Sequence, residues 1–157
     1  MKALTILQPF AELICCGAKR NETRHWQVSY RGTIAVHTGK KMYPDALALM
    51  MREPFVKYLP NDQLIPLGCF VAVAELYDIQ TAEEYAAEVK LRLSHPAWDG
   101  QKRKLIRDEL EFGDYSSGRF VWRLRNVRRL KAPVIARGIQ RLLEPTKDQH
   151  QQIEQQL

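Results

Sequence analysis

One segment, GRFVWRLRNV at residues 118–127, most constrains the fold, because large apolar and basic side chains alternate along it. Alternate residues of an extended strand point to opposite faces of a sheet. The first face would hold Phe120, Trp122 and Leu124. The second would hold Arg119, Val121, Arg123 and Arg125. The segment therefore predicts a strand with one face in the core and a row of guanidinium groups on the other.

Other strand-like segments are separated by helical ones. The predicted strands are residues 4–7, 22–27, 33–38 and the nearly continuous apolar run 68–79. The predicted helices are residues 10–16, 43–52, 82–93 and about 102–110. Short strands with helices inserted between them, and no repeating βαβ rhythm, favour an α+β fold over a doubly wound sheet. We expect a small, mostly antiparallel β-barrel.

The size of the chain favours a single domain. With 157 residues, of which 45% are hydrophobic, it can bury one substantial core. We predict one domain over residues 1–143, with a helical insert at about 80–114, followed by a polar tail at 144–157 that can form a loosely attached helix. The longest apolar stretch, 68–74, is far shorter than the ~20 residues of a membrane helix, and the first residues do not match a secretory signal. We expect a soluble, cytoplasmic protein with its three cysteines as buried thiols.

The positive charge is concentrated in one stretch. Residues 115–143 hold eight Lys or Arg residues, seven of them Arg, and no acid, so this stretch accounts for the whole net charge of +6. A localised basic stretch is typical of a surface that binds a polyanion, although it is also compatible with a solvated strand face. The predicted contacts to a nucleic-acid backbone are Arg119, Arg123, Arg125, Arg128 and Arg129.

Three charged residues gather in GAKRNETRHW, residues 17–26, where a helix is expected to turn into a strand. In an extended segment Glu22 and Arg24 project to the same side, and Lys19 precedes them. Glu75 lies in the apolar run, where a carboxylate either has a cationic partner or titrates. Lys19 and Arg24 are the candidate partners, so we expect these four residues to converge on one cleft.

Aromatic and imidazole side chains near this segment are candidates for stacking on an unpaired base. The predicted ligand-binding residues are Arg24, His25, Trp26 and Tyr115. A divalent metal held by Glu22, Glu75 and His37 is conceivable, but no ligand spacing indicates it, and we expect no metal and no other cofactor. We interpret His37 as a strand histidine with its own hydrogen-bond partners rather than as a metal ligand.

The segment GAKRNETR resembles the G-x-K-x-x-E-x-R signature of ASCH domains, which are related to the PUA superfamily of RNA-binding β-barrels. The likeness extends to ILQPFAELI, to YRGTIAVHTGKK, to the strand that carries Glu75, and to the segments GDYSSGRFVWRLRNVRRL and ARGIQ. The resemblance implies a PUA-like barrel, a cleft beside the helix-to-strand junction, and binding of RNA, another nucleic acid or a nucleoside-like small molecule.

The resemblance also implies two hydrolytic alternatives. A bacterial branch is similar to acetylcytidine amidohydrolases, whose site uses a lysine, a threonine three residues later and a glutamate on a later strand. Lys19 and Glu75 match, but Glu22 occupies the threonine position and the side chain of Thr23 should point the other way. Some relatives are ribonucleases, for which Lys19, Glu22 and Glu75 are candidate catalytic residues.

Four interpretations therefore remain open at the level of sequence. We favour a nucleic-acid-binding module whose charged cleft accepts a base or nucleoside-like ligand. The alternative is a hydrolase that acts in the same cleft, as a ribonuclease or as an amidohydrolase on a modified nucleobase. A weaker alternative is a protein-interaction adaptor. The charged residues can also be a purely structural ion network that fixes the helix on the barrel.

Overall fold

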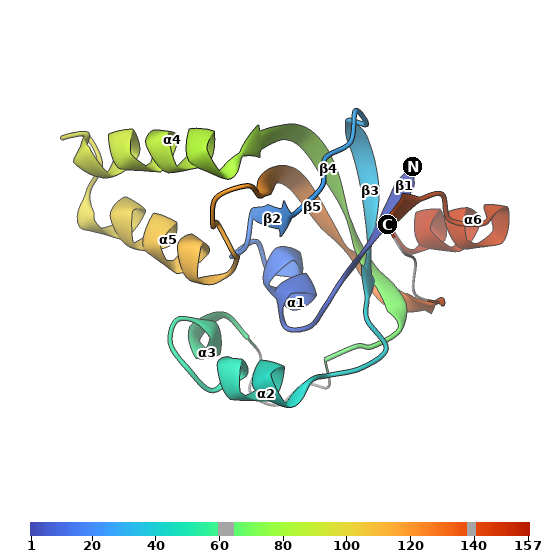
Figure 1. The fold of residues 1–157 in the computed structure, drawn as a ribbon. Helices are drawn as coiled ribbons and strands as arrows, with labels where there is room; N and C mark the ends of the chain where they lie inside the picture. The colour runs from blue at the N-terminus through green and yellow to red at the C-terminus, as the bar shows by residue number, and fades with distance from the viewer. Residues whose placement is uncertain (60–64, 138–140) are drawn as a thin grey trace.

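The computed structural model describes residues 1–59, 65–137 and 141–157, so the end of the ARGIQ segment, 138–140, lies outside it. Within these residues, six strands form one sheet in the order β2-β5-β4-β3-β1-β6. The strands are β1 (Lys2–Ile6), β2 (Asn21–Arg24), β3 (Gly32–Thr38), β4 (Cys69–Thr81), β5 (Phe120–Ile135) and β6 (Leu142–Leu143). All neighbouring strands are antiparallel except β1 and β3. The sheet curls into a half-barrel (Figure 1), which confirms the predicted α+β fold.

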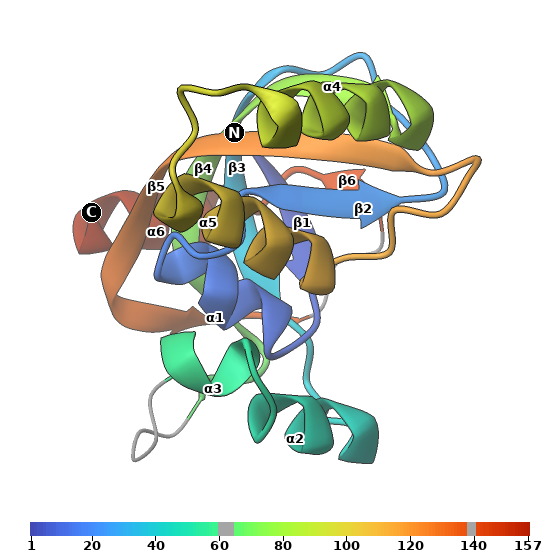
Figure 2. The ribbon, with the colours of Figure 1, turned by 90° about the vertical axis from the view of Figure 1, so that its left-hand side faces the viewer.

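The helices lie on both faces of this sheet (Figures 1 and 2). They are α1 (Phe10–Cys15), α2 (Pro44–Met50), α3 (Phe55–Tyr58), α4 (Ala82–Ser94), α5 (Gly100–Glu111) and α6 (Lys147–Gln156). The consecutive helices α4 and α5 run side by side at one end of the sheet. No helix in the described parts of the chain is long and apolar enough to cross a membrane.

The core is divided by the sheet. On the inner face, Trp122 and Leu124 of β5 pack with Leu76 of β4 and with Ile14 of α1. On the outer face, Val121 packs under α4 and α5 with further buried apolar side chains, which are Tyr85, Val89 and Ile106. The two faces of β5 thus follow the predicted alternation. The face that carries Val121 is, however, covered by helices at this end rather than open to solvent.

Local sequence signals set several of the boundaries. Gly17 ends α1 with a φ of +79°, a conformation that glycine adopts without the steric cost of a Cβ. At α4, Thr81 and Glu84 form the predicted capping box, in which each side chain accepts the other residue's backbone N–H.

The polar tail also contains a capped helix, α6, whose Ile153 is fully buried against the sheet. The predicted loose attachment of this helix is therefore wrong.

A β-bulge interrupts the long strand β5. Arg125 pairs with Glu75 and Arg128 pairs with Val73, so β5 has one more residue than β4 between these pairs. Asn126 lies in the bulge and has a φ of +51°. Such a bulge changes which side chains of a strand face inward. The simple alternation inferred from residues 118–127 therefore does not continue along the rest of β5.

Candidate functional site

The junction between α1 and β2 places Lys19 in a buried position. The backbone N–H of Lys19 donates to the carbonyl oxygen of Leu13 over 2.9 Å, which holds the chain as it leaves the helix. The side chain is only 1% exposed. Its Nζ donates to the carbonyl oxygen of Phe112 over 2.6 Å and lies 3.5 Å from Oε2 of Glu22. A buried ammonium group needs such partners, and here both a carbonyl and a carboxylate provide them.

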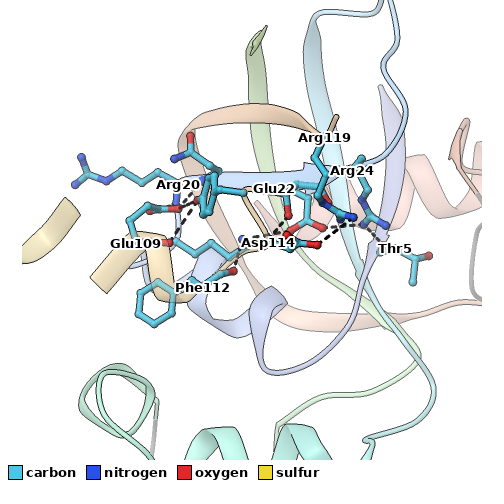
Figure 3. Close-up of polar contacts among 12 residues, drawn as sticks. Thr5, Arg20, Glu22, Arg24, Glu109, Phe112, Asp114 and Arg119 are labelled. Atoms are coloured by element: carbon cyan, nitrogen blue, oxygen red, sulfur yellow. Dashed lines mark hydrogen bonds and ion pairs between the residues drawn. The ribbon is translucent and has the colours of Figure 1, made fainter. Parts of the chain in front are cut away.

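Glu22 links this buried lysine to the surface. Its other oxygen, Oε1, lies 3.1 Å from Nη2 of Arg24, which also donates to the carbonyl oxygen of Thr5 over 2.8 Å. The side chain of Glu22 is 12% exposed and that of Arg24 is 25% exposed. Figure 3 shows these side chains between β2 and β1. The predicted gathering of Lys19, Glu22 and Arg24 is therefore present, and solvent reaches its Glu22–Arg24 edge.

A second carboxylate, that of Glu109 on α5, supports the junction from the other side (Figure 3). Its oxygens accept the backbone N–H groups of Arg20 over 2.7 Å and of Asn21 over 3.1 Å. The hydroxyl of Tyr115 donates to Oε1 over 3.2 Å. Burial raises the pKa of Glu109, and the nearby charge of Lys19 opposes this effect. We call Lys19, Glu22, Arg24 and Glu109 the junction cluster.

Glu75 does not belong to the junction cluster. Its predicted partners were Lys19 and Arg24, but its Oε1 accepts from Nη2 of Arg125 over 2.6 Å and its Oε2 accepts from Nδ2 of Asn126 over 2.8 Å. Hydrogen bonds from Arg125 and from Asn126 lower the pKa of Glu75. The predicted pairing of Glu75 with the junction cations is therefore wrong.

Strand register explains this separation. Residues directly opposite each other in neighbouring strands share a face of the sheet. Glu22 pairs with Trp122, whose side chain is in the inner core, whereas Glu75 pairs with Arg125. Ala74 and Leu76, on either side of Glu75, both contribute to the inner core, so Glu75 points away from it. Glu22 and Glu75 thus lie on opposite faces.

Four of the five predicted backbone-binding arginines have carboxylate partners. The pairs are Arg119 with Asp114 at 3.3 Å, Arg123 with Glu88 at 2.9 Å, Arg125 with Glu75 at 2.6 Å, and Arg129 with Glu12. Arg123 is the least accessible, with 15% of its side chain exposed and a bidentate contact to Glu88. Arg128 is exposed and has no carboxylate within 4.0 Å among the described residues. Four of the eight cations of the basic stretch are therefore paired with acids from outside it.

These arginines also divide between the two faces of the sheet. Arg123 and Arg125 share the outer face with Val121, as the alternation predicts. After the bulge, Arg129 lies opposite Ala72, a residue of the inner core, and its guanidinium reaches α1. The row of guanidinium groups is thus split rather than continuous.

The candidate ligand-binding rings occupy different places. His25 is exposed just beyond β2, and Trp26 is half-buried with its ring edge-on to Trp122 at 4.7 Å between centroids. Tyr115 lies on the outer side of β2, where its ring stacks on Tyr85 at 5.3 Å. Burial raises the pKa of the Tyr115 hydroxyl. His25 and Trp26 therefore follow β2 directly, whereas Tyr115 contacts Glu109 of the cluster from the outer side of that strand.

The remaining candidate side chains have structural partners. The Nδ1 of His37 lies 3.2 Å from Oγ1 of Thr5, and its Nε2 lies 3.2 Å from the carbonyl oxygen of Ala136. Burial lowers the pKa of His37. In residues 1–59, 65–137 and 141–157, no group of three or more His, Cys, Asp or Glu side chains is placed to hold a metal ion.

Cys16 is exposed and Cys15 is half-buried, so the prediction of three buried thiols is wrong.

The family model of the ASCH domain matches residues 4–133, which include α1, the junction cluster and most of β5. The chain belongs to the ASCH domain family. Its fold is similar to the crystal structure of ASCH from Zymomonas mobilis, with a TM-score of 0.54, 14% identity, and coverage of 98% of this chain and 93% of that one. A single-residue variant of the same protein matches with a TM-score of 0.54, 12% identity and coverage of 98% and 96%. The search of curated proteins found no match.

Proposed function

We propose that this ASCH domain binds RNA or another nucleic acid and that its junction cluster accepts a base or a nucleoside-like group. The observation that supports this most is the Glu22–Arg24 pair, which places an acceptor and a donor side by side at a point that solvent reaches. Base edges carry amines beside carbonyl or ring-nitrogen acceptors. The Glu22 carboxylate would accept from an exocyclic amine while the Arg24 guanidinium donates to a neighbouring acceptor.

The surrounding contacts favour recognition because they hold this pair in place before a ligand arrives. Lys19 contacts Glu22 from the buried side and has its own acceptor in the carbonyl of Phe112. Thr5 accepts from Arg24, which fixes the guanidinium relative to β1. A preorganised site loses less conformational entropy on binding than a mobile one. Lys19 thus acts as a support for the ligand-binding pair.

Arg119 is the best-placed arginine for a phosphate next to the bound base. Phe120 pairs with Arg24, so Arg119 lies beside the edge of the cluster, and its Nη2 donates to the carbonyl oxygen of Thr23 over 3.2 Å. Its partner Asp114 has a side chain that is 58% exposed. An exposed ion pair of this kind is weak and exchanges readily for a phosphate.

The test is equilibrium binding of a fluorescent single-stranded RNA decamer by the wild-type domain and by Arg24→Gln. Hydrogen bonds to charged groups contribute about 1.5–3 kcal/mol, so the variant should bind roughly ten- to a hundredfold more weakly. Arg52→Gln removes an exposed arginine near the end of α2 and is the matched control. Equal affinity of Arg24→Gln and the control would refute the proposal.

A hydrolase acting at the same cluster is the second candidate. The observation that favours it is the position of Glu22, a partly accessible carboxylate held between Lys19 at 3.5 Å and Arg24 at 3.1 Å. Such a carboxylate can accept a proton from a 2′-hydroxyl while a cation stabilises the phosphorane. Thr23 cannot act as a nucleophile at this cluster, because its side chain lies on the outer face of the sheet, where its Oγ1 accepts the N–H of Asp114.

Incubation with an RNA pool and a panel of acylated nucleosides, with and without divalent metal, separates the two candidates. An enzyme would release products detectable by mass spectrometry, and Glu22→Gln would abolish them. A binding module would leave the RNA and the nucleosides chemically intact with either protein. Metal-dependent turnover that Glu22→Gln does not change would contradict both candidates, because the protein would then be an enzyme whose catalysis does not use Glu22.

A further inference from the structure

An open hollow lies beside α4 and α5 on the outer side of the sheet, on the opposite side of β2 from the Glu22–Arg24 pair. Figures 1 and 2 show the two helices side by side at one end of the molecule. The hollow has a volume of about 470 Å³ and is lined by residues that include Ala86, Val89, Lys90, Leu93, Leu110 and Tyr115. Pockets for small molecules typically measure about 300–1,000 Å³ and are mostly apolar with a few polar groups. This hollow has both properties.

Two tyrosine rings form the inner wall of the hollow. Tyr85 and Tyr115 stack with 5.3 Å between centroids and an interplanar angle of 21°. Their hydroxyls are already engaged, because Nδ2 of Asn21 donates to Tyr85 over 2.9 Å and Tyr115 donates to Glu109. The rings therefore offer the hollow mainly apolar surface, which suits an aromatic or aliphatic group.

Lys90 supplies a cation at the rim. Its side chain is exposed, and within the described residues no carboxylate lies within 4.0 Å of its Nζ. Glu88, two positions earlier on α4, is engaged by Arg92 and Arg123. The two helices together carry six Lys or Arg and six Asp or Glu residues, so the preference for an anion comes from the ammonium group of Lys90 itself.

We infer that this hollow binds a small amphipathic anion, whose apolar body lies against Val89, Leu93 and the tyrosine rings and whose carboxylate pairs with Lys90. The inference follows from the apolar walls and from the cation at the rim. It does not depend on nucleic-acid binding at the Glu22–Arg24 pair, since that pair lies on the other side of β2.

The test uses the aromatic sulfonate 1-anilinonaphthalene-8-sulfonate as a fluorescent probe and decanoate as its competitor, with the whole chain. The probe should bind one site, and decanoate should displace it while decanol, which lacks the charge, competes at least tenfold less well. Lys90→Glu should weaken decanoate binding about tenfold, because it replaces attraction by repulsion. Ala86→Trp, at an exposed helix position, should abolish binding by filling the hollow.

Lys102→Glu is the matched control, because Lys102 has the same charge on α5 but does not line the hollow. Circular dichroism of every variant checks that the fold is intact. Equal decanoate affinity in Lys90→Glu and Lys102→Glu would overturn the inference, as would saturable probe binding in folded Ala86→Trp. Displacement by an RNA decamer but not by decanoate would also overturn it, and would assign the helix pair to nucleic acid. Arg24→Gln should leave decanoate binding unchanged, so the two proposals fail independently.

Discussion

Glu109 is the residue on which the geometry of the junction most depends. Its carboxylate accepts two successive backbone N–H groups, those of Arg20 and Asn21, at the start of β2. It also accepts the hydroxyl of Tyr115. Since Lys19 and Glu22 are attached to the backbone on either side of these two residues, Glu109 fixes where their side chains begin.

Replacing Glu109 by alanine should destabilise the fold. It would leave the N–H groups of Arg20 and of the buried Asn21 without this acceptor, and an unsatisfied buried group costs about 1–3 kcal/mol. We expect the free energy of unfolding, measured by urea denaturation, to fall by about 3 kcal/mol. Glu109→Gln keeps an acceptor oxygen and should cost less. Glu111→Ala, at an exposed position of the same helix, is the control, and a loss in Glu109→Ala no larger than in the control would contradict this role.

The titration of Glu75 provides a pH test. Hydrogen bonds from Arg125 and Asn126 lower its pKa from the ordinary value of 4.5. Its contribution to stability is therefore present above the pKa of the unfolded chain and is lost as the pH falls through the lower, folded pKa. An NMR titration should give a midpoint below 4.5, and Arg125→Gln should move it upward. A midpoint that is the same in both proteins would exclude the pairing.

The sequence predicted three residues of the junction cluster but misassigned Glu75 and missed Glu109. The sequence was sufficient to predict Lys19, Glu22 and Arg24, because they lie in one short segment whose strand geometry sets the directions of their side chains. Glu109 lies 89 positions from Arg20 in the sequence. Nothing in the sequence of its helix distinguishes this buried acid from acids that are exposed. The need of Glu75 for a cation was correctly predicted, but its partner depends on the register of β4 and β5, which no local pattern specifies.

At the scale of elements, local sequence signals predicted the positions of helices and strands better than they predicted how these elements pack together. The capping box at Thr81 and the glycine at position 17 marked helix ends that the structure has. The bulge at Asn126 was not predicted, because it arises from pairing with β4. The attachment of α6 was also misjudged, because a single apolar residue, Ile153, anchors an otherwise polar helix.

Truncating this anchor should destabilise the protein. Ile153 is fully buried beside Phe70 and Val73 on the outer face of the sheet. Replacing a buried isoleucine by alanine typically costs about 2–5 kcal/mol through lost burial and the cavity left behind. Thermal denaturation of Ile153→Ala should show a clear loss relative to Gln152→Ala, its exposed neighbour. Equal melting temperatures would mean that α6 does not pack on the sheet in solution.

At the scale of the molecule, folding brings acids from other parts of the chain to the arginines that the sequence concentrates in one stretch. The basic stretch 115–143 has no acid of its own, but acids of α1, β4 and α4 reach its arginines in space. Composition predicts the net charge, whereas the face on which it is available depends on long-range pairing. The arginines of β5 are therefore divided between the two faces of the sheet, and Arg123, Arg125 and Arg129 are ion-paired.

The salt dependence of RNA binding should reflect this ion pairing. About three phosphate contacts to a single strand would give a slope near −2 for log affinity against log salt, since each contributes about −0.7. Arg119→Gln should make the slope shallower by about 0.7. Arg123→Gln should leave it unchanged, because Glu88 holds that guanidinium. A shallower slope in Arg123→Gln would show that its ion pair opens to bind phosphate.

The most direct test of the central claim is an NMR titration of the ¹⁵N-labelled domain with a single-stranded RNA decamer, following the Nε–H of Arg24 and the backbone amides of residues 20–24. We predict that the largest chemical-shift changes occur at Arg24 and along β2, and that Arg24→Gln removes them while Arg52→Gln does not. Saturable binding that leaves Arg24 and β2 unchanged, with shifts confined to α4 and α5 or to Arg128, would contradict the claim.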